Sequence, residues 1–69
     1  MSEITSAILG KLDARFADCF NGFYTKAKCR ESAYFVRQVR EEAGRIAFFD
    51  LDHELSTAEV REILEAFFA

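Results

Sequence analysis

Apolar residues recur along the chain with the period of a helix in three segments. From residue 3 to about residue 21 they return every three or four positions, which gathers them on one face at about 100° per residue. The same period returns over residues 25–48 and again over residues 57–68. Asn21-Gly22 separates the first two segments, because both residue types tolerate a left-handed backbone. The pattern predicts an all-α fold, a small bundle of three amphipathic helices.

The third helix has the clearest local start signal. Ser56 is an N-cap whose hydroxyl can accept a hydrogen bond from the amide of Glu59, while the Glu59 carboxylate can accept one from the amide of Ser56. Leu55 and Val60 stand at the two positions of a hydrophobic staple. We therefore expect this helix to begin at Thr57.

The end of the second helix is less sharply marked. Gly44 either caps this helix or lies inside it, and residues 46–51 fit a last helical turn or a short extended piece equally well. We favour a helix that continues to about Phe48.

The acidic segment between these two helices has the spacing of a metal loop at its start. Asp50, Asp52 and Glu54 match the first three ligand positions of an EF-hand calcium loop. The sixth position, which requires glycine, is Leu55, and the twelfth, which requires a bidentate glutamate, is Arg61. The pattern therefore favours an acidic helix entry over a calcium site, and we expect neither a metal nor a cofactor.

Size limits the protein to one domain, residues 1–69, whose stability as a lone monomer would be marginal because so short a chain buries only about 60% of its unfolded surface. The N-terminus lacks the pattern of a secretion signal. No apolar stretch is close to the length of about 18 residues that is needed to span a bilayer. We expect a cytoplasmic protein. Cys19 and Cys29 fall on apolar arcs and are expected to be buried free thiols; a disulfide, a redox role and a zinc site remain alternatives that their spacing disfavours.

Catalytic residues are not suggested by any local spacing. His53 is the only histidine, and no serine or cysteine has a base placed near it by the sequence. We expect the protein not to be an enzyme.

The aromatic content gives the strongest functional hint. The chain contains eight phenylalanines and two tyrosines. Adjacent residues on a helix point about 100° apart, so Phe48-Phe49 and Phe67-Phe68 cannot all face one narrow core. We predict a homodimer that buries the third helix or the second phenylalanine of each pair; the alternative is a core broad enough to take every ring. The residues expected to self-associate are Phe48, Ile63, Phe67 and Phe68.

Charge is unevenly distributed along the chain. Residues 1–45 carry eight basic and six acidic side chains, for a net +2, whereas residues 46–69 carry one basic and six acidic side chains, for a net −5; together they give the overall −3. On the predicted second helix a basic stripe lies beside Tyr34. Its members are Lys26, Arg30, Arg37 and Arg40.

These features favour a small protein-interaction module, an inhibitor or adaptor that binds and modulates another protein such as a transcription regulator. The residues expected to contact that partner are Tyr34, Arg37, Arg40, Phe49, Asp50 and Asp52. The alternative is a helical DNA-binding regulator that presents the basic stripe to phosphates. The acidic pI of about 5.0 disfavours unspecific nucleic-acid binding.

Overall fold

The structure, a computed structural model, describes residues 1–20 and 23–69. Within these two ranges the regular secondary structure is entirely helical. The elements are α1 (Glu3–Arg15), a 3₁₀ turn η1 (Ala17–Cys19), α2 (Lys26–Cys29), α3 (Ala33–Arg45), a π-helical turn η2 (Ile46–Asp50) and α4 (Thr57–Phe67). The predicted all-α fold is confirmed.

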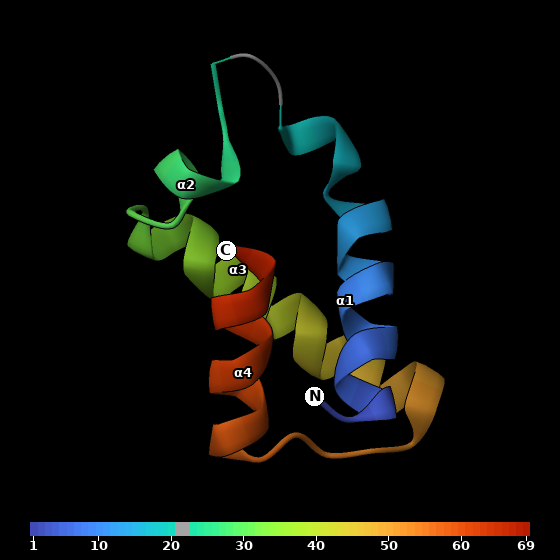
Figure 1. Ribbon diagram of the computed structural model, residues 1–69. Coiled ribbons are helices and arrows are strands. Elements are labelled where there is room, and N and C mark those ends of the chain that lie inside the picture. Colours follow the sequence, from blue (N-terminus) through green and yellow to red (C-terminus); the bar gives the residue numbers. More distant parts are fainter. Residues whose placement is uncertain (21–22) are drawn as a thin grey trace.

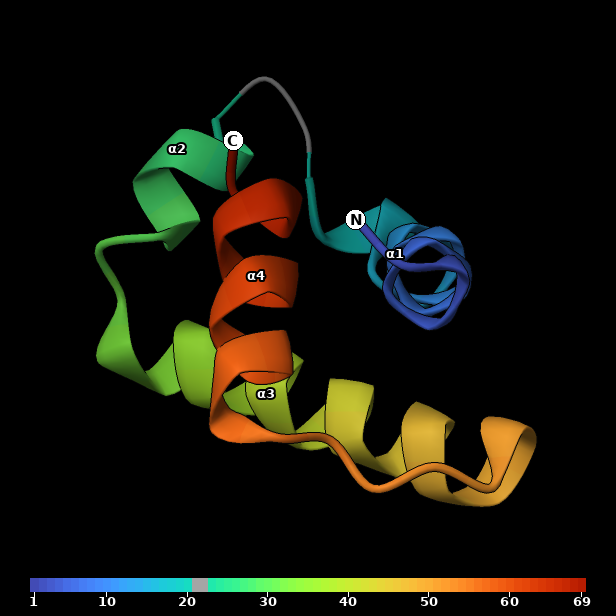
Figure 2. The same cartoon turned by 60° about the horizontal axis from the view of Figure 1, so that its bottom comes forward.

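Three helices form the body of the molecule. α1, α3 and α4 contact one another, and α3 passes behind both α1 and α4 in Figure 1. η2 continues α3, and the loop that follows leads along the end of the molecule to the start of α4 (Figure 1). In Figure 2 the other helices lie above α3, so its lower side has no helical neighbour in the part of the chain that is described.

The core lies between α1, α4 and the rod formed by α3 and η2. Burial of each large apolar side chain there contributes roughly 1.5–3 kcal/mol. The buried apolar residues are Ile8, Leu12, Val39, Ala43, Ile46, Ala47, Ile63, Phe67 and Phe68. Thr5 is also buried, and its hydroxyl lies 2.8 Å from that of Ser2, the N-cap of α1.

A phenylalanine cluster closes the core at the end next to α2. The rings meet edge to face or tilted, with centroids 5.0 to 6.2 Å apart. Its members are Phe16, Phe20, Phe35, Phe67 and Phe68. The core of a single chain thus takes five of the eight phenylalanines, including both members of the Phe67-Phe68 pair.

The predicted helix over residues 25–48 is broken between Cys29 and Ala33. Ser32 has an extended backbone (φ −90°, ψ 111°), and its hydroxyl accepts a hydrogen bond from the amide of Phe35 at 3.2 Å. A serine that satisfies an otherwise unpaired amide begins a new helix. The expectation of one continuous helix over residues 25–48 was therefore wrong.

The first helix is shorter than the predicted range of residues 3–21. α1 ends at Arg15, where Phe16 leaves helical geometry at φ −105° and ψ 13°, and the chain continues as η1. The side chain of Cys19 is exposed, which contradicts the expected buried thiol, whereas that of Cys29 is half-buried; both are free. The predicted break at Asn21-Gly22 lies outside the described residues.

Residues 46–50 are helical, which settles the ambiguity left by the sequence. Gly44 lies inside α3 and does not cap it. The amide of His53 donates to the carbonyl of Ala47 at 2.9 Å. Asp52 then adopts a left-handed φ of 50°, a conformation that aspartate tolerates better than most residues and that turns the chain away from the rod.

α4 begins as predicted. The Ser56 hydroxyl accepts from the amide of Glu59 at 3.1 Å, and the Glu59 carboxylate accepts from the amide of Ser56 at 2.9 Å. The two bonds together form the capping box. The helix ends at Phe67, and Phe68 leaves it with φ −94° and ψ 7°. Helical spacing therefore no longer sets the direction of the Phe68 side chain.

Candidate functional site

The aromatic residues that the core excludes gather at the two ends of α3. Phe48 and Phe49, on η2, are 62% and 76% exposed, and their rings meet edge to face with centroids 5.0 Å apart. A π-helical turn that buries Ile46 and Ala47 leaves this pair on the outside. The expectation that the second phenylalanine of a pair looks outward holds for Phe49.

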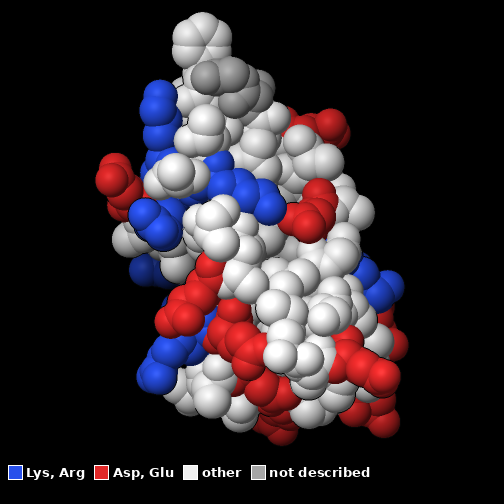
Figure 3. All heavy atoms as spheres, viewed as in Figure 1, with Lys and Arg blue, Asp and Glu red and all other residues white. Residues whose placement is uncertain are grey.

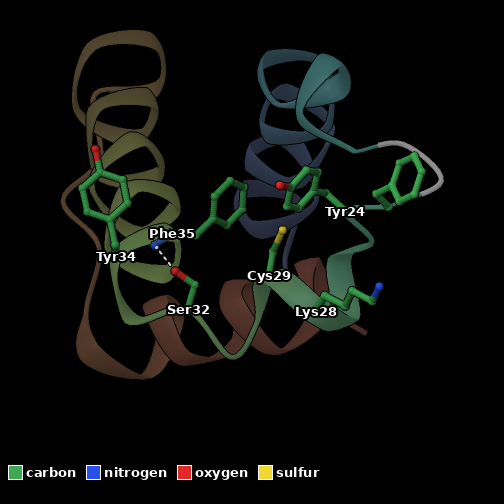
Figure 4. A pocket seen from close by; sticks show the side chains of 7 residues that line it. Tyr24, Lys28, Cys29, Ser32, Tyr34 and Phe35 are labelled. Atoms are coloured by element: carbon green, nitrogen blue, oxygen red, sulfur yellow. Dashed lines mark hydrogen bonds between the residues drawn. The ribbon is translucent and has the colours of Figure 1, made fainter.

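At the other end of α3, aromatic side chains line a pocket of about 550 Å³. Figure 4 shows Tyr24, Cys29 and Phe35 close together between α3 and α1, while Lys28 and Tyr34 point away from them. The lining residues are Phe23, Tyr24, Lys28, Cys29, Ser32, Tyr34 and Phe35. Such a lining suits an apolar or aromatic group, and none of these seven side chains is a histidine or a carboxylate.

A second groove, of about 470 Å³, contains three of the four predicted basic-stripe residues. Arg30 comes from the turn after α2, and Arg37 and Arg40 come from successive turns of α3. Among the residues that the structure describes, no acidic side chain forms an ion pair with any of these guanidinium groups. Glu31, Ala33 and Val36 complete the groove.

Lys26 is not part of this groove, which corrects the predicted stripe. Its ammonium group lies 2.8 Å from the Asp13 carboxylate and 4.4 Å from the centroid of the Phe67 ring. The break at residues 30–32 separates α2 from α3, so one helical projection no longer relates Lys26 to the arginines. Lys26 attaches α2 to α1 and α4.

The predicted acidic contact residues, Asp50 and Asp52, are both exposed but differ in their ion pairs. Asp50 is engaged within the chain, with a carboxylate oxygen 3.7 Å from Lys11 and 3.4 Å from Arg15. Arg15 also pairs with Glu42, so Asp50 belongs to a cluster that fastens η2 to α1. Asp52 is exposed and forms no ion pair with any described residue. Of the two, only Asp52 could meet a partner without exchanging an ion pair within the described chain.

His53 has a structural partner. Its Nε2 lies 2.9 Å from one oxygen of Glu59, the acidic member of the capping box. The backbone amide of Ser56, and secondly the His53 side chain, hydrogen-bond the Glu59 carboxylate and lower its pKa. In residues 1–20 and 23–69, no three histidine, cysteine or acidic side chains lie close enough together to hold a metal ion.

Three of the four predicted self-association residues belong to the core of the single chain. Ile63, Phe67 and Phe68 are at most 3% exposed, so none of them offers a surface to a second molecule. Phe68 is buried because its ring packs on Phe35 and Phe67 at 6.2 and 5.0 Å. Only Phe48 is placed at the surface, as self-association requires.

Sequence reasoning missed the pocket at the start of α3. Phe23 is 80% exposed, and Tyr24 is 62% exposed. The signal that could have shown this is Thr25, which caps α2 through a hydrogen bond from the amide of Lys28. A cap at this position means that Phe23 and Tyr24 precede a helix instead of extending one.

Charge is unevenly distributed on one face of the molecule. On the face shown in Figure 3, lysine and arginine gather toward the α2 end, while aspartate and glutamate gather toward the end where α4 begins. This agrees with the opposite net charges of residues 1–45 and 46–69.

Comparison of the chain with protein-family models, with curated proteins and with solved structures found no match in any of the three. None of the described helices is both long and apolar enough to cross a membrane.

Proposed function

We propose that this protein is a non-enzymatic protein-interaction module, an inhibitor or adaptor that acts by occupying a surface of another polypeptide. The observation that carries the proposal is the Phe48-Phe49 pair, which stays exposed although the core is closed without it. Exposed apolar groups of this kind lower their free energy by burial against a partner.

Other exposed residues along the rod formed by α3 and η2 also suit an interface. Tyr34 is 70% exposed on the same rod, and Arg37 and Arg40 are available without first breaking an ion pair in the described chain. Tyrosine and arginine are enriched among the residues that contribute most to binding. Asp52 adds an exposed negative charge beside η2 and would favour a partner with a basic residue near an apolar patch.

Site-specific photocrosslinking tests the proposal. A benzophenone amino acid in place of Phe49 should trap a defined protein in the cells that make this chain, because this position lies at the centre of the proposed contact. The same amino acid in place of Phe23, which is also strongly exposed but lies on the other side of the α2 turn, is the matched control. Equal, diffuse crosslinking from both positions would contradict the proposal.

A second candidate, a DNA-binding regulator, is favoured by the groove that contains Arg30, Arg37 and Arg40. Three guanidinium groups along one groove can contact successive phosphates. This function predicts an affinity for duplex DNA that falls steeply with salt and is lost in Arg37→Ala/Arg40→Ala. Absence of binding at low salt would exclude it.

A further inference from the structure

One exposed stripe runs the length of the rod formed by α3 and η2. Successive members are separated by four, three, four and four positions, the spacing that keeps side chains on one side of a helix. They are Ala33, Arg37, Arg40, Gly44 and Phe48, and we call them the α3 stripe. None of the five is buried.

The middle of the stripe is open. A Cβ atom added at Gly44 would meet nothing within 4 Å. Glycine costs a helix interior roughly 0.5–1 kcal/mol relative to alanine, so the fold of the single chain gives no reason for it here. A small residue does let a second helix approach the backbone closely.

We infer that two copies of this chain pair through the α3 stripe, antiparallel about a twofold axis between Arg40 and Glu41. This goes beyond the proposed function, because the second polypeptide is a copy of this chain and the stripe contains Phe48 but not Phe49. Antiparallel alignment about that point sets Phe48 of each copy opposite Ala33 of the other, and Arg37 opposite Gly44. Each large side chain then meets a small one.

Charge complementarity supports this register. Arg40 of one copy stands opposite Glu41 of the other, and the twofold axis repeats the pair. Within the described chain Glu41 forms no ion pair, even with Arg37 one turn before it. The same alignment therefore pairs opposite charges on both sides of the axis.

The surface area that such a pair would bury is that of a weak dimer. The rod of 18 residues, Ala33 to Asp50, is about 27 Å long at 1.5 Å per residue. A single pair of helices of that length buries a surface area at or below the lower end of the range for stable interfaces, which is about 1,200–2,000 Å². The pair should therefore dissociate on dilution.

Charge exchange, followed by sedimentation over a range of protein concentrations, tests the inference. Arg40→Glu and Glu41→Arg should each weaken dimerisation about 100-fold, because each places like charges together twice. The double variant Arg40→Glu/Glu41→Arg should restore it. Arg61→Glu, an equal change of charge on α4, is the matched control and should leave it unchanged.

A change of size gives a second readout that does not depend on charge. Gly44→Gln should raise the melting temperature of the dilute monomer, because glutamine is the better helix former, yet weaken dimerisation because its side chain fills the stripe. A misfolded variant would instead lose both.

Three results would overturn the inference. They are a wild-type chain that stays monomeric at every concentration, a double variant that does not recover, and equal effects of Arg40→Glu and Arg61→Glu. A monomer that binds duplex DNA through Arg37 and Arg40 would also overturn it and would favour the second candidate function. If the chain stays monomeric while a crosslinker at Phe49 still traps a different protein, the inference fails and the proposed function stands.

Discussion

Phe49 and Phe68, the second residues of the two Phe-Phe pairs, should differ in how much stability is lost when the ring is removed. Phe68 is 3% exposed and Phe49 is 76% exposed, although each is the second residue of a Phe-Phe pair. Removing a buried phenylalanine side chain costs about 3–5 kcal/mol. Because Phe68 lies beyond the end of α4, where the chain can relax, we expect about 3 kcal/mol for Phe68→Ala. For Phe49→Ala we expect a change within about 0.5 kcal/mol.

These magnitudes are large for this molecule. A domain of 69 residues has a free energy of unfolding of about 3–10 kcal/mol. Phe68→Ala therefore removes a third or more of the stability and can prevent folding. Phe68→Leu keeps most of the apolar volume, should cost about 1 kcal/mol and leaves a folded protein to measure.

The assay is urea denaturation followed by far-ultraviolet circular dichroism, at a concentration low enough that self-association does not contribute. The free energy of unfolding should rank wild type and Phe49→Ala together, then Phe68→Leu, then Phe68→Ala. If Phe68→Ala were as stable as wild type, the C-terminal ring would not belong to the core. A loss of more than about 2 kcal/mol in Phe49→Ala would mean that the exposed pair is part of the monomer fold.

Three further predictions concern the helices. Ser56→Ala should lower the free energy of unfolding by about 1 kcal/mol, the usual value of a lost N-cap, and an unchanged melting temperature would refute this role. Gly10→Ala should raise the free energy of unfolding by roughly 0.5–1 kcal/mol, because alanine is the better helix former and a Cβ there meets nothing within 4 Å. A loss of stability would mean that a Cβ at this position clashes with another part of the molecule. The pKa of Glu59 is lowered below its ordinary value of 4.5, so its contribution is complete above that pH and is lost as the pH falls through the lowered pKa. Glu59→Gln should therefore flatten the acid decline of the melting temperature, and a parallel decline would contradict the assignment.

The features that could be predicted from the sequence are those set by residues close together in the chain. The start of α4 was predicted correctly because Ser56 and Glu59 satisfy each other's amides within one turn. The same kind of signal was present at Ser32, where a polar residue three positions before Phe35 begins α3. It was overlooked because Ser32 also fits the apolar arc of an uninterrupted helix.

The candidate site was harder to predict because distant parts of the chain decide which side chains remain accessible. Asp50 is exposed, but its carboxylate is engaged by Lys11 and Arg15, which come from α1. Phe68 is buried because its ring meets Phe35 of α3. No local spacing encodes either contact. The expectation that some of these rings look outward held for Phe48 and Phe49, but the angle between neighbouring residues did not predict that both of them would.

The attachment of α2 has a consequence for the evolution of this protein. α2 has no fully buried residue, and the Lys26 contacts with Asp13 and Phe67 account for much of its anchoring. Local opening there should cost little free energy and leave the three long helices intact. Residues 23–31 can therefore accept substitutions, or even an inserted peptide, at little risk to folding. New binding specificities would arise most easily in this appendage, next to a body that stays unchanged.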